Sequence, residues 1–250
     1  MDYTFTCERF DIRRTLFCGQ AFRWKELDGR FCGIAGGRYA EISDNGDSTY
    51  TVHDIEKSDI SYWRSYFDLD TDYDALIKQF SEDEHMKLAC KENPGIRVLR
   101  QEPFETLISF IISQNNNIKR ITGIIDRLYE SFGEKTDRGY MFPTLEKLVG
   151  VTAEDLAPLR AGFRARYIVD AVEKLSSGEV SLDGIKAMDT TAAREELKKI
   201  KGVGDKVADC VLLFGYHKTD AFPRDVWIKR IEQKLYPDGL PECIKGNEGI

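Results

Sequence analysis

The sequence predicts an α+β protein in which a small N-terminal antiparallel β-sheet domain is followed by an all-helical domain. Over roughly the first 55 residues, aromatic and β-branched segments alternate with two-residue turn signals, as is typical of antiparallel strands. From Ser58 onward the hydrophobic residues follow helical spacing instead. We place the domain border at the loop Asn93-Pro-Gly95, which gives domains of residues 1–95 and 96–250.

Three turn signals divide the N-terminal segment, namely Asp28-Gly29, Gly36-Gly37 and Asn45-Gly46. The residues between them favour strands, so we expect a small meander over residues 1–55. A further turn is predicted at Gly19-Gln20, before the first strand of the meander.

Helices are predicted for most of the remaining chain, because apolar residues recur at three- and four-residue spacing. We expect them at residues 59–67, 73–80, 82–91, 104–112, 118–132, 145–149, 153–159, 166–175, 191–200, 205–214 and 226–235. The helix at 104–112 is apolar on nearly every side, so it should lie at the centre of its domain. Pro103 precedes it, and proline is well tolerated in a first helical turn.

Composition narrows the class of protein. With 42% hydrophobic and 11% aromatic residues among 250, the chain can bury one large core or two modest ones. The longest apolar run, residues 107–112, is too short to span a bilayer, and the N-terminus lacks a signal segment. We therefore expect a soluble, intracellular protein without a membrane partner. The net charge of −7 argues against non-specific coating of nucleic acid but allows a local basic face.

Metal and disulfide chemistry is not indicated. The six cysteines are scattered without a C-x-x-C pair, so reduced thiols are expected. There are only three histidines, and no Cys/His cluster suggests a zinc or four-cysteine iron-sulfur site. We expect no required cofactor and no metal bound by side chains.

The predicted chemistry is concentrated in residues 197–230. This stretch reads as a helix end, the turn Gly202-Val203-Gly204, a helix from Asp205, and another helix opened by Asp225. The glycines permit a tight turn and leave N–H groups uncovered at a helix start, where the dipole favours an anion such as phosphate. Alternatively, the turn could serve merely to join two packed helices and bind nothing.

Lys206 and Asp225 each lie at the first turn of a helix, a place that commonly borders a cleft. The amine is a candidate nucleophile, and the carboxylate could stabilise positive charge that develops on a sugar ring. The plainer alternatives are a solvated lysine and a structural N-cap. Lys206 shares one helix face with Cys210, which by default is a small hydrophobic residue.

Two other segments suggest contact with DNA. The three asparagines Asn115-Asn-Asn117 could be ordinary cap and turn residues or could hydrogen-bond to base edges. Residues 160–166 contain three arginines and no acid, and Phe163 lies among these arginines. A compact DNA footprint could be built from such groups.

Together these residues resemble a known family. Residues 197–227 look like the helix-hairpin-helix motif, with its following Gly/Pro…Asp loop, of the base-excision DNA glycosylase superfamily. Within it the chain resembles the 8-oxoguanine DNA glycosylase/lyases, because four more blocks match in the family order. They are Gly19-Gln-Ala-Phe-Arg-Trp24, Leu99-Arg-Gln-Glu-Pro103, Ile108-Ser-Phe-Ile-Ile-Ser-Gln-Asn-Asn-Asn-Ile118 and Gly162-Phe-Arg-Ala-Arg-Tyr167.

The resemblance implies a base-excision repair enzyme, both DNA N-glycosylase and β-elimination (AP) lyase, that removes 8-oxoguanine from duplex DNA opposite cytosine. By position, Lys206 would attack the sugar C1′, release the base and form a Schiff base. Asp225 would stabilise the charged transition state and help to position or deprotonate the lysine. The resemblance also assigns Gly19, Cys210 and Phe214 to the damaged base: the Gly19 carbonyl would accept its N7–H, and Cys210 would stack on it.

Three more groups of residues take their roles from the resemblance. Asn115, Arg120 and Arg164 would hydrogen-bond the orphaned cytosine, and Phe163 would be wedged into the stack as the base flips. The backbone of Gly202, Val203 and Gly204 would bind a DNA phosphate, and a cation could be held there by carbonyl groups.

The chain departs from the family at several points. Trp227 stands where several relatives have histidine, and Phe214 where some have methionine. Relatives also continue with a helix that closes over the base, and by position it would begin near residue 250. The resemblance leaves open whether the sequence is a fragment or lacks this lid.

Other functions remain open on the sequence alone. They are a helix-hairpin-helix glycosylase for another damaged base, a non-catalytic damaged-DNA-binding module, and a protein-interaction domain. Lys206 favours the lyase over monofunctional glycosylases, whereas the net negative charge favours the binding module. We expect a monomer that acts on duplex DNA, in the cytoplasm or nucleoid of a bacterium or in the nucleus of a eukaryote.

Overall fold

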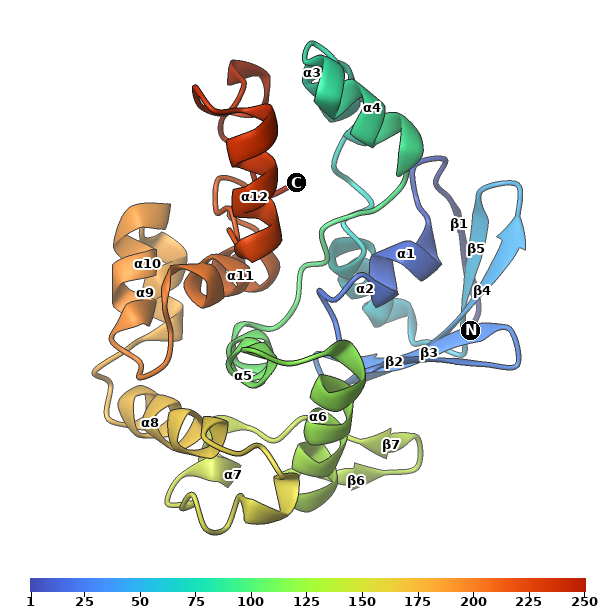
Figure 1. Cartoon of the computed structure of the whole chain (residues 1–250). Helices are drawn as coiled ribbons and strands as arrows, with labels where there is room; N and C mark the ends of the chain where they lie inside the picture. The colour runs from blue at the N-terminus through green and yellow to red at the C-terminus, as the bar shows by residue number, and fades with distance from the viewer.

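The computed structural model describes all 250 residues and confirms the predicted α+β class. A sheet with its accompanying helices forms one side of the molecule, and a helical domain forms the other (Figure 1). No helix has both the length and the apolar character needed to cross a membrane.

The N-terminal sheet contains five antiparallel strands in the order β1-β5-β4-β3-β2. Their bounds are β1 (Tyr3–Thr6), β2 (Trp24–Leu27), β3 (Arg30–Ala35), β4 (Arg38–Gly46) and β5 (Thr49–His53). The predicted meander is therefore confirmed for β2 to β5, and β1 adds to its far edge beside β5.

Two of the three predicted turns are correct. Asp28-Gly29 and Gly36-Gly37 have positive φ at both positions, as a tight two-residue hairpin turn requires. The third prediction, Asn45-Gly46, is wrong by two residues. The turn is made by Asp47 and Ser48, with φ of 50° and 59°, because β4 continues through a bulge where the register shifts between Asp44 and Gly46.

A short helix, α1 (Ile12–Phe17), interrupts the segment that the sequence predicted to be all strand. The Asp11 side chain caps it by accepting a hydrogen bond from the Arg14 N–H at 2.8 Å. Ile12 and Leu16 are buried in the sheet-domain core. A helix of this length shows too few apolar positions to establish a helical period, so only its cap could have revealed it.

The helices of the sheet domain follow the strands. They are the 3₁₀ turn η1 (Lys57–Asp59), α2 (Ile60–Tyr66), α3 (Tyr73–Phe80) and α4 (Glu84–Glu92). Trp63 and Phe67 pack against Trp24 of the sheet, with ring centres 6.1 and 5.9 Å from the Trp24 ring. The sheet domain thus has its own aromatic core.

The helical domain contains α5 (Pro103–Ser113), α6 (Ile118–Phe132), α7 (Leu145–Leu148), the 3₁₀ turn η2 (Ala157–Leu159), α8 (Arg164–Ser176), α9 (Leu182–Ala187), α10 (Thr190–Lys198), α11 (Asp205–Tyr216), α12 (Val226–Leu235) and the 3₁₀ turn η3 (Glu242–Ile244). A small hairpin, β6 (Lys135–Thr136) and β7 (Gly139–Tyr140), follows α6. Neither α9 nor this hairpin was predicted, because both are too short to show a period.

The predicted helix at 153–159 is wrong, because only its last residues form the turn η2. Thr152 and Asp155 hydrogen-bond each other's backbone N–H groups through their side chains, which stabilises a turn in place of a helix. Pro158 lacks the N–H that a continuing helix would use.

α5 is the central helix, as its apolar sequence predicted (Figure 1). All residues from Thr106 to Ile112 are buried, and α6, α8 and α11 pack around it. The largest core of the protein therefore lies beneath α11, the helix that follows the glycine turn.

A buried ion pair joins the two domains. Arg23 comes from the sheet domain and is almost fully buried, and its guanidinium lies 3.4 Å from the Glu105 carboxylate on α5. It also donates to the Tyr140 carbonyl and lies over the Tyr129 ring, 4.7 Å from its centre. Burial raises the pKa of Glu105, while the positive charge of Arg23 opposes that rise.

Arg23→Met should lower the free energy of unfolding by about 3 kcal/mol near neutral pH, because it leaves the Glu105 carboxylate buried without its partner. A carboxyl whose pKa is raised by folding stabilises the fold at low pH and loses that contribution as pH rises through the folded-state value. The difference in free energy of unfolding between Arg23→Met and the unsubstituted protein should therefore become smaller towards pH 4. Urea unfolding of both proteins at the two pH values measures this, with Arg30→Met, at an exposed ion pair, as the matched control. An equal loss in both variants would contradict the assignment.

Candidate active site

The glycine turn joins α10 to α11 as the sequence predicted. Gly202 has φ of +84°, and a Cβ atom there would lie 2.3 Å from the Tyr167 ring, so the close approach of Tyr167 requires glycine. Val203 is buried, and its N–H donates to the Ile200 carbonyl at 3.0 Å. The turn is thus held by the Tyr167 ring against Gly202 and by the burial of Val203.

The start of α11 presents unpaired backbone donors. Gly204 is the N-cap but has no side chain to cap the helix, and the N–H groups of Asp205, Lys206 and Val207 donate to no acceptor in the protein. Open space surrounds the Cβ position of Gly204. Such a helix end binds anions, because its donors and its dipole point the same way. Of the three predicted phosphate-binding residues, Val203 has its own N–H engaged inside the turn.

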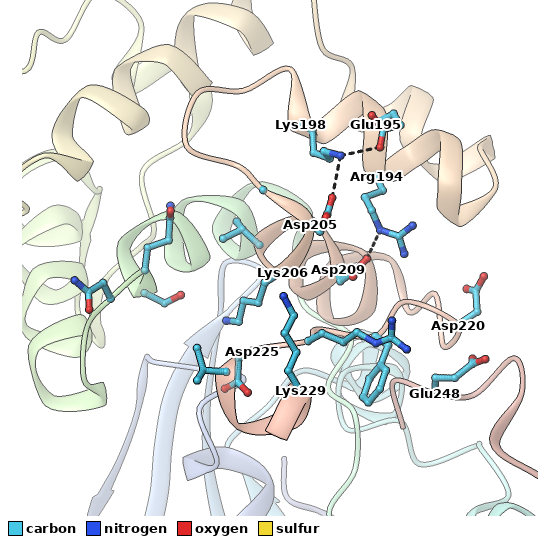
Figure 2. Close-up of a pocket in the computed structure, with 18 of the residues that line it drawn as sticks. Arg194, Glu195, Lys198, Asp205, Lys206, Asp209, Asp220, Asp225, Lys229 and Glu248 are labelled. Atoms are coloured by element: carbon cyan, nitrogen blue, oxygen red, sulfur yellow. Dashed lines mark hydrogen bonds and ion pairs between the residues drawn. The ribbon is translucent and has the colours of Figure 1, made fainter. Parts of the chain in front are cut away.

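Lys206 leaves the first turn of α11 and forms no ion pair. Its Nζ lies 5.1 Å from the centre of the Phe110 ring, which belongs to α5. Figure 2 shows its side chain beside that of Asp225, which comes from the start of α12. The amine is thus held between an aromatic ring and a carboxylate-bearing turn, without a fixed counter-ion.

Asp225 is the N-cap of α12, which confirms the structural role that the sequence allowed for it. Its Oδ1 accepts hydrogen bonds from the N–H groups of Trp227 at 2.9 Å and Ile228 at 2.8 Å. Its Oδ2 accepts none from the protein. The cap fixes the orientation of the carboxylate and leaves one oxygen available for chemistry.

Lys206 and Asp225 lie where two cavities meet. One is a largely polar groove of about 1240 Å³, which also includes Asn115 and Gly204. The other is a pocket of about 570 Å³, of whose 27 lining residues 17 are hydrophobic. Both side chains line both cavities. A group bound in the pocket could therefore remain attached to a chain lying in the groove.

The three residues predicted to hold a damaged base line this apolar pocket together. Gly19 comes from the loop after α1 and has φ of +100°, whereas Cys210 and Phe214 come from α11. Phe214 is stacked on Phe110, with ring centres 5.4 Å apart and planes 15° apart. The walls of the pocket thus come from both domains.

The Cys210 thiol is neutral. It is only 1% exposed, and burial raises the pKa of its thiol to about 11 even though the nearby Lys206 ammonium lowers it. A neutral thiol is a polarisable apolar surface and a poor nucleophile at physiological pH. Cys210 is therefore suited to pack against a bound group and not to react with it.

The residues predicted to face the opposite base form a cluster at the edge of the groove, which Asn115 lines. Arg164 is 3% exposed, and its guanidinium donates to the carbonyls of Gln114 and Asn115, each at 2.9 Å. Burial lowers the pKa of Arg164, and the neighbouring charge of Arg120 lowers it further. Arg120 and Asn115 are exposed, and neither forms an ion pair. In this structure Arg164 thus orders the asparagine loop, while Arg120 and Asn115 face solvent.

Phe163 is an exposed aromatic next to this cluster. It is 51% exposed immediately before α8, although most large hydrophobic residues of the chain are buried. The Arg164 guanidinium lies 4.4 Å from its ring centre, and the Tyr167 ring packs against it edge-on at 5.6 Å. These contacts hold the ring in a protruding orientation.

Sequence reasoning missed the charged wall of the groove. Arg194 pairs with the buried Asp209 at 2.6 Å, and Lys198 pairs with Asp205 at 2.9 Å (Figure 2). Burial raises the pKa of Asp209, and Arg194 opposes that rise. Lys229 lines the groove without an ion pair. The spacing of Asp205 and Asp209 places them on one face of α11, but their partners on α10 could not be inferred without the packing.

Helix N–H groups exposed at a turn between two helices, beside a lysine, an aspartate and an apolar pocket, define a DNA glycosylase of the helix-hairpin-helix class. Comparison with known families agrees. A model described as the N-terminal domain of 8-oxoguanine DNA glycosylase matches residues 3–107, and one described as HhH-GPD superfamily base excision DNA repair protein matches residues 108–239. The chain belongs to the 8-oxoguanine DNA glycosylase/lyase family of base-excision DNA repair proteins, which confirms the predicted resemblance.

Known relatives carry matching names. An N-glycosylase/DNA lyase of Saccharomyces cerevisiae is 39% identical over 187 residues, which cover 68% of this chain and 50% of the yeast protein. A probable N-glycosylase/DNA lyase of Methanothermobacter thermautotrophicus is 32% identical over 264 residues, which cover 91% of this chain and 83% of the archaeal one. The chain thus spans half the length of the yeast relative and most of the archaeal one.

Solved structures agree in fold. The 8-oxoguanine glycosylase/lyase of Clostridium acetobutylicum in its apo form superposes with a TM-score of 0.92 at 36% identity, covering 99% of this chain and 93% of that one. The same enzyme in complex with double-stranded DNA containing cytosine opposite 8-oxoG gives 0.89 at 38% identity, covering 97% and 89%.

Alanine at the two glycines of the turn should have different effects. Gly202→Ala should destabilise the fold by at least about 2 kcal/mol, because the added Cβ meets the Tyr167 ring at a left-handed φ. Gly204→Ala should cost less than about 1 kcal/mol, because its φ of −100° suits alanine and the space is open. Its methyl group should nevertheless weaken duplex binding about tenfold by covering the anion-binding N–H groups.

Thermal unfolding and fluorescence anisotropy with a DNA duplex measure both effects. Normal DNA binding by folded Gly204→Ala would show that the start of α11 is not the phosphate site.

Proposed function

We propose that this chain excises 8-oxoguanine paired with cytosine in duplex DNA and then cleaves the strand by β-elimination. One observation carries the proposal: Lys206 and Asp225 lie where the polar groove opens into the apolar pocket. A DNA strand in the groove would place a flipped base in the pocket and its sugar against both side chains.

The amine of Lys206 attacks C1′ of the flipped nucleotide. The N-glycosidic bond breaks, its electron pair leaves with the base, and the base takes up a proton. Loss of the amine protons and opening of the sugar ring give a Schiff base, which makes the C2′ proton acidic. Removal of that proton breaks the C3′–O bond, and hydrolysis then regenerates the lysine. The free carboxylate oxygen of Asp225 stabilises the positive charge that develops on the sugar.

Recognition of the lesion rests on one backbone group and two side chains. In 8-oxoguanine N7 carries a hydrogen, whereas in guanine N7 is an acceptor. A carbonyl at Gly19 therefore accepts a hydrogen bond from the lesion and repels undamaged guanine. The neutral Cys210 thiol packs on the face of the base, and Phe214 closes the wall beside Phe110.

The opposite cytosine is assigned to Asn115, Arg120 and Arg164. Asn115 and Arg120 are exposed beside Arg164 and have no carboxylate partner, so both can donate hydrogen bonds to the orphaned base. The buried Arg164 guanidinium already donates to backbone carbonyls, so it would exchange one of these bonds for a bond to the base. Phe163 beside them fills the gap left by the flipped nucleotide. The assignment of cytosine is supported by the solved Clostridium complex, whose double-stranded DNA contains cytosine opposite 8-oxoG.

No cofactor is required under this proposal, because Lys206 and Asp225 supply the nucleophile and the charged partner. The turn Gly202-Val203-Gly204 and the N–H groups that follow it would bind a DNA phosphate. No group of three or more acidic, histidine or cysteine side chains could hold a metal. A cation at the turn between α10 and α11 would instead be bound by backbone carbonyls, and the carbonyls of Lys198 and Val203 accept no hydrogen bond.

The functional unit under this proposal is a monomer, because a single chain supplies every group named above. Its place of action is wherever the cell keeps its DNA, which is the cytoplasm and nucleoid in a bacterium and the nucleus in a eukaryote.

Lys206→Gln should abolish borohydride trapping on a duplex with 8-oxoguanine opposite cytosine, because an amide cannot form the Schiff base. Lys229→Gln is the matched control, since it removes another amine from the same groove. It should keep the trapped adduct but bind DNA more weakly. Gel analysis of trapped complexes decides the point, and undiminished trapping in Lys206→Gln would remove this residue from the mechanism.

Asp225→Asn should separate the cap from the chemistry. Asparagine is also a good N-cap, so the free energy of unfolding should change by less than about 0.5 kcal/mol. Base excision should fall by at least about 100-fold, because the charge facing the sugar is lost. Excision rates on the 8-oxoguanine duplex test this, and a rate close to that of the unmodified protein would leave Asp225 as a cap only.

A further inference from the structure

The loop that carries Gly19 is fixed by a buried glutamine. Gln20 is 4% exposed, and its Nε2 donates to the carbonyls of Thr15 at 2.9 Å and Arg97 at 2.8 Å. Its Oε1 accepts from the Leu99 N–H at 2.9 Å. The loop is thereby tied to residues 97–101, the segment that leads from the sheet domain to α5.

Gln101, in the same segment, is bonded to both walls of the apolar pocket. Its side-chain Nε2 donates to the carbonyl of Gln20 at 2.7 Å, directly after Gly19. Its backbone N–H donates to the carbonyl of Phe214 at 2.7 Å, near the end of α11. One residue thus links the loop predicted to read the base with the helix that carries Lys206 and Cys210.

No other single residue is hydrogen-bonded both to residues 18–20 and to α11. Residues 18–20 form no direct hydrogen bond with α11, and the two elements belong to different domains. Gln101 is therefore the one residue that is hydrogen-bonded to both walls, which are also in indirect contact through Phe110, packed between Phe22 and Phe214. A hydrogen bond between the Gly19 carbonyl and a base depends steeply on the distance between the two walls, because such bonds weaken sharply beyond about 3.2 Å.

We propose that Gln101 is a positioning residue for base recognition, which holds the Gly19 carbonyl at its working distance from the Lys206 helix. The inference rests on the proposed function. Gln101 lines neither the groove nor the apolar pocket, so it should matter for selecting the damaged base and not for the reaction of the lysine with an abasic sugar.

Gln101→Met tests this, because methionine keeps the length of the side chain and loses the Nε2 donor. The backbone bond to Phe214 remains. Excision of 8-oxoguanine under single-turnover conditions should fall about tenfold, as should the binding preference for an 8-oxoguanine duplex over a guanine duplex. Cleavage of a preformed abasic site should stay within about twofold of the unsubstituted protein.

Gln79→Met is the matched control. Gln79 also donates through Nε2 to a distant carbonyl, that of Cys243 at 2.6 Å, but it forms no hydrogen bond with the Gly19 loop. This variant should retain both the excision rate and the preference for damaged DNA. A similar selective loss in Gln79→Met would show that any bond between these distant segments has this effect, and would overturn the special role of Gln101.

The remaining outcomes are also decisive. Equal losses of excision and abasic-site cleavage in Gln101→Met would mean that the residue only supports the fold, and no loss in either would mean that it has no role; each contradicts the inference. Failure of the unsubstituted protein to cleave an abasic site would instead refute the proposed lyase function itself.

Discussion

The site depends on how one helix, α11, is held along its length. At its start the Gly202 turn is fixed against Tyr167, and in its middle Val207, Val211 and their neighbours are buried against α5. At its end Gln101 bonds the Phe214 carbonyl, and His217 stops the helix in a left-handed conformation with φ of 53°. Because all three parts are constrained, the first turn cannot shift without disturbing the core. Lys206 and the free N–H groups therefore keep a fixed relation to the groove.

A net negative charge is compatible with binding to DNA, because the groups that would contact the DNA are concentrated in one groove. The net charge is −7, yet the groove offers helix N–H groups, Lys229 and the nearby Arg120 without carboxylate partners. Other charges in the groove are neutralised within the protein, as in the Arg194–Asp209 and Lys198–Asp205 pairs. A few unpaired donors at defined positions suit the proposed recognition of one flipped nucleotide, whereas a broad basic surface would bind any DNA.

Local signals made part of the fold predictable. Helices α3, α6 and α12 begin and end at the predicted residues, because each combines a clear apolar period with an Asp or Asn cap. Where several local forces compete, prediction failed: the bulge in β4 moved a turn, and side-chain bonding at Thr152 prevented a helix. The turn and its lysine were visible in the sequence. The use of Arg164 to hold the Gln114 carbonyl and the role of Gln101 were not, since both depend on contacts between distant segments.

The central claim is that Lys206, at the start of α11, is the residue that bonds to the sugar. The most direct measurement is peptide mapping by mass spectrometry of the complex that borohydride traps on an 8-oxoguanine·cytosine duplex. The account predicts that the sugar remnant is found on the peptide that contains Lys206, attached to its Nζ. A remnant on the amino group of Met1, on Lys229 or on any other amine would contradict it.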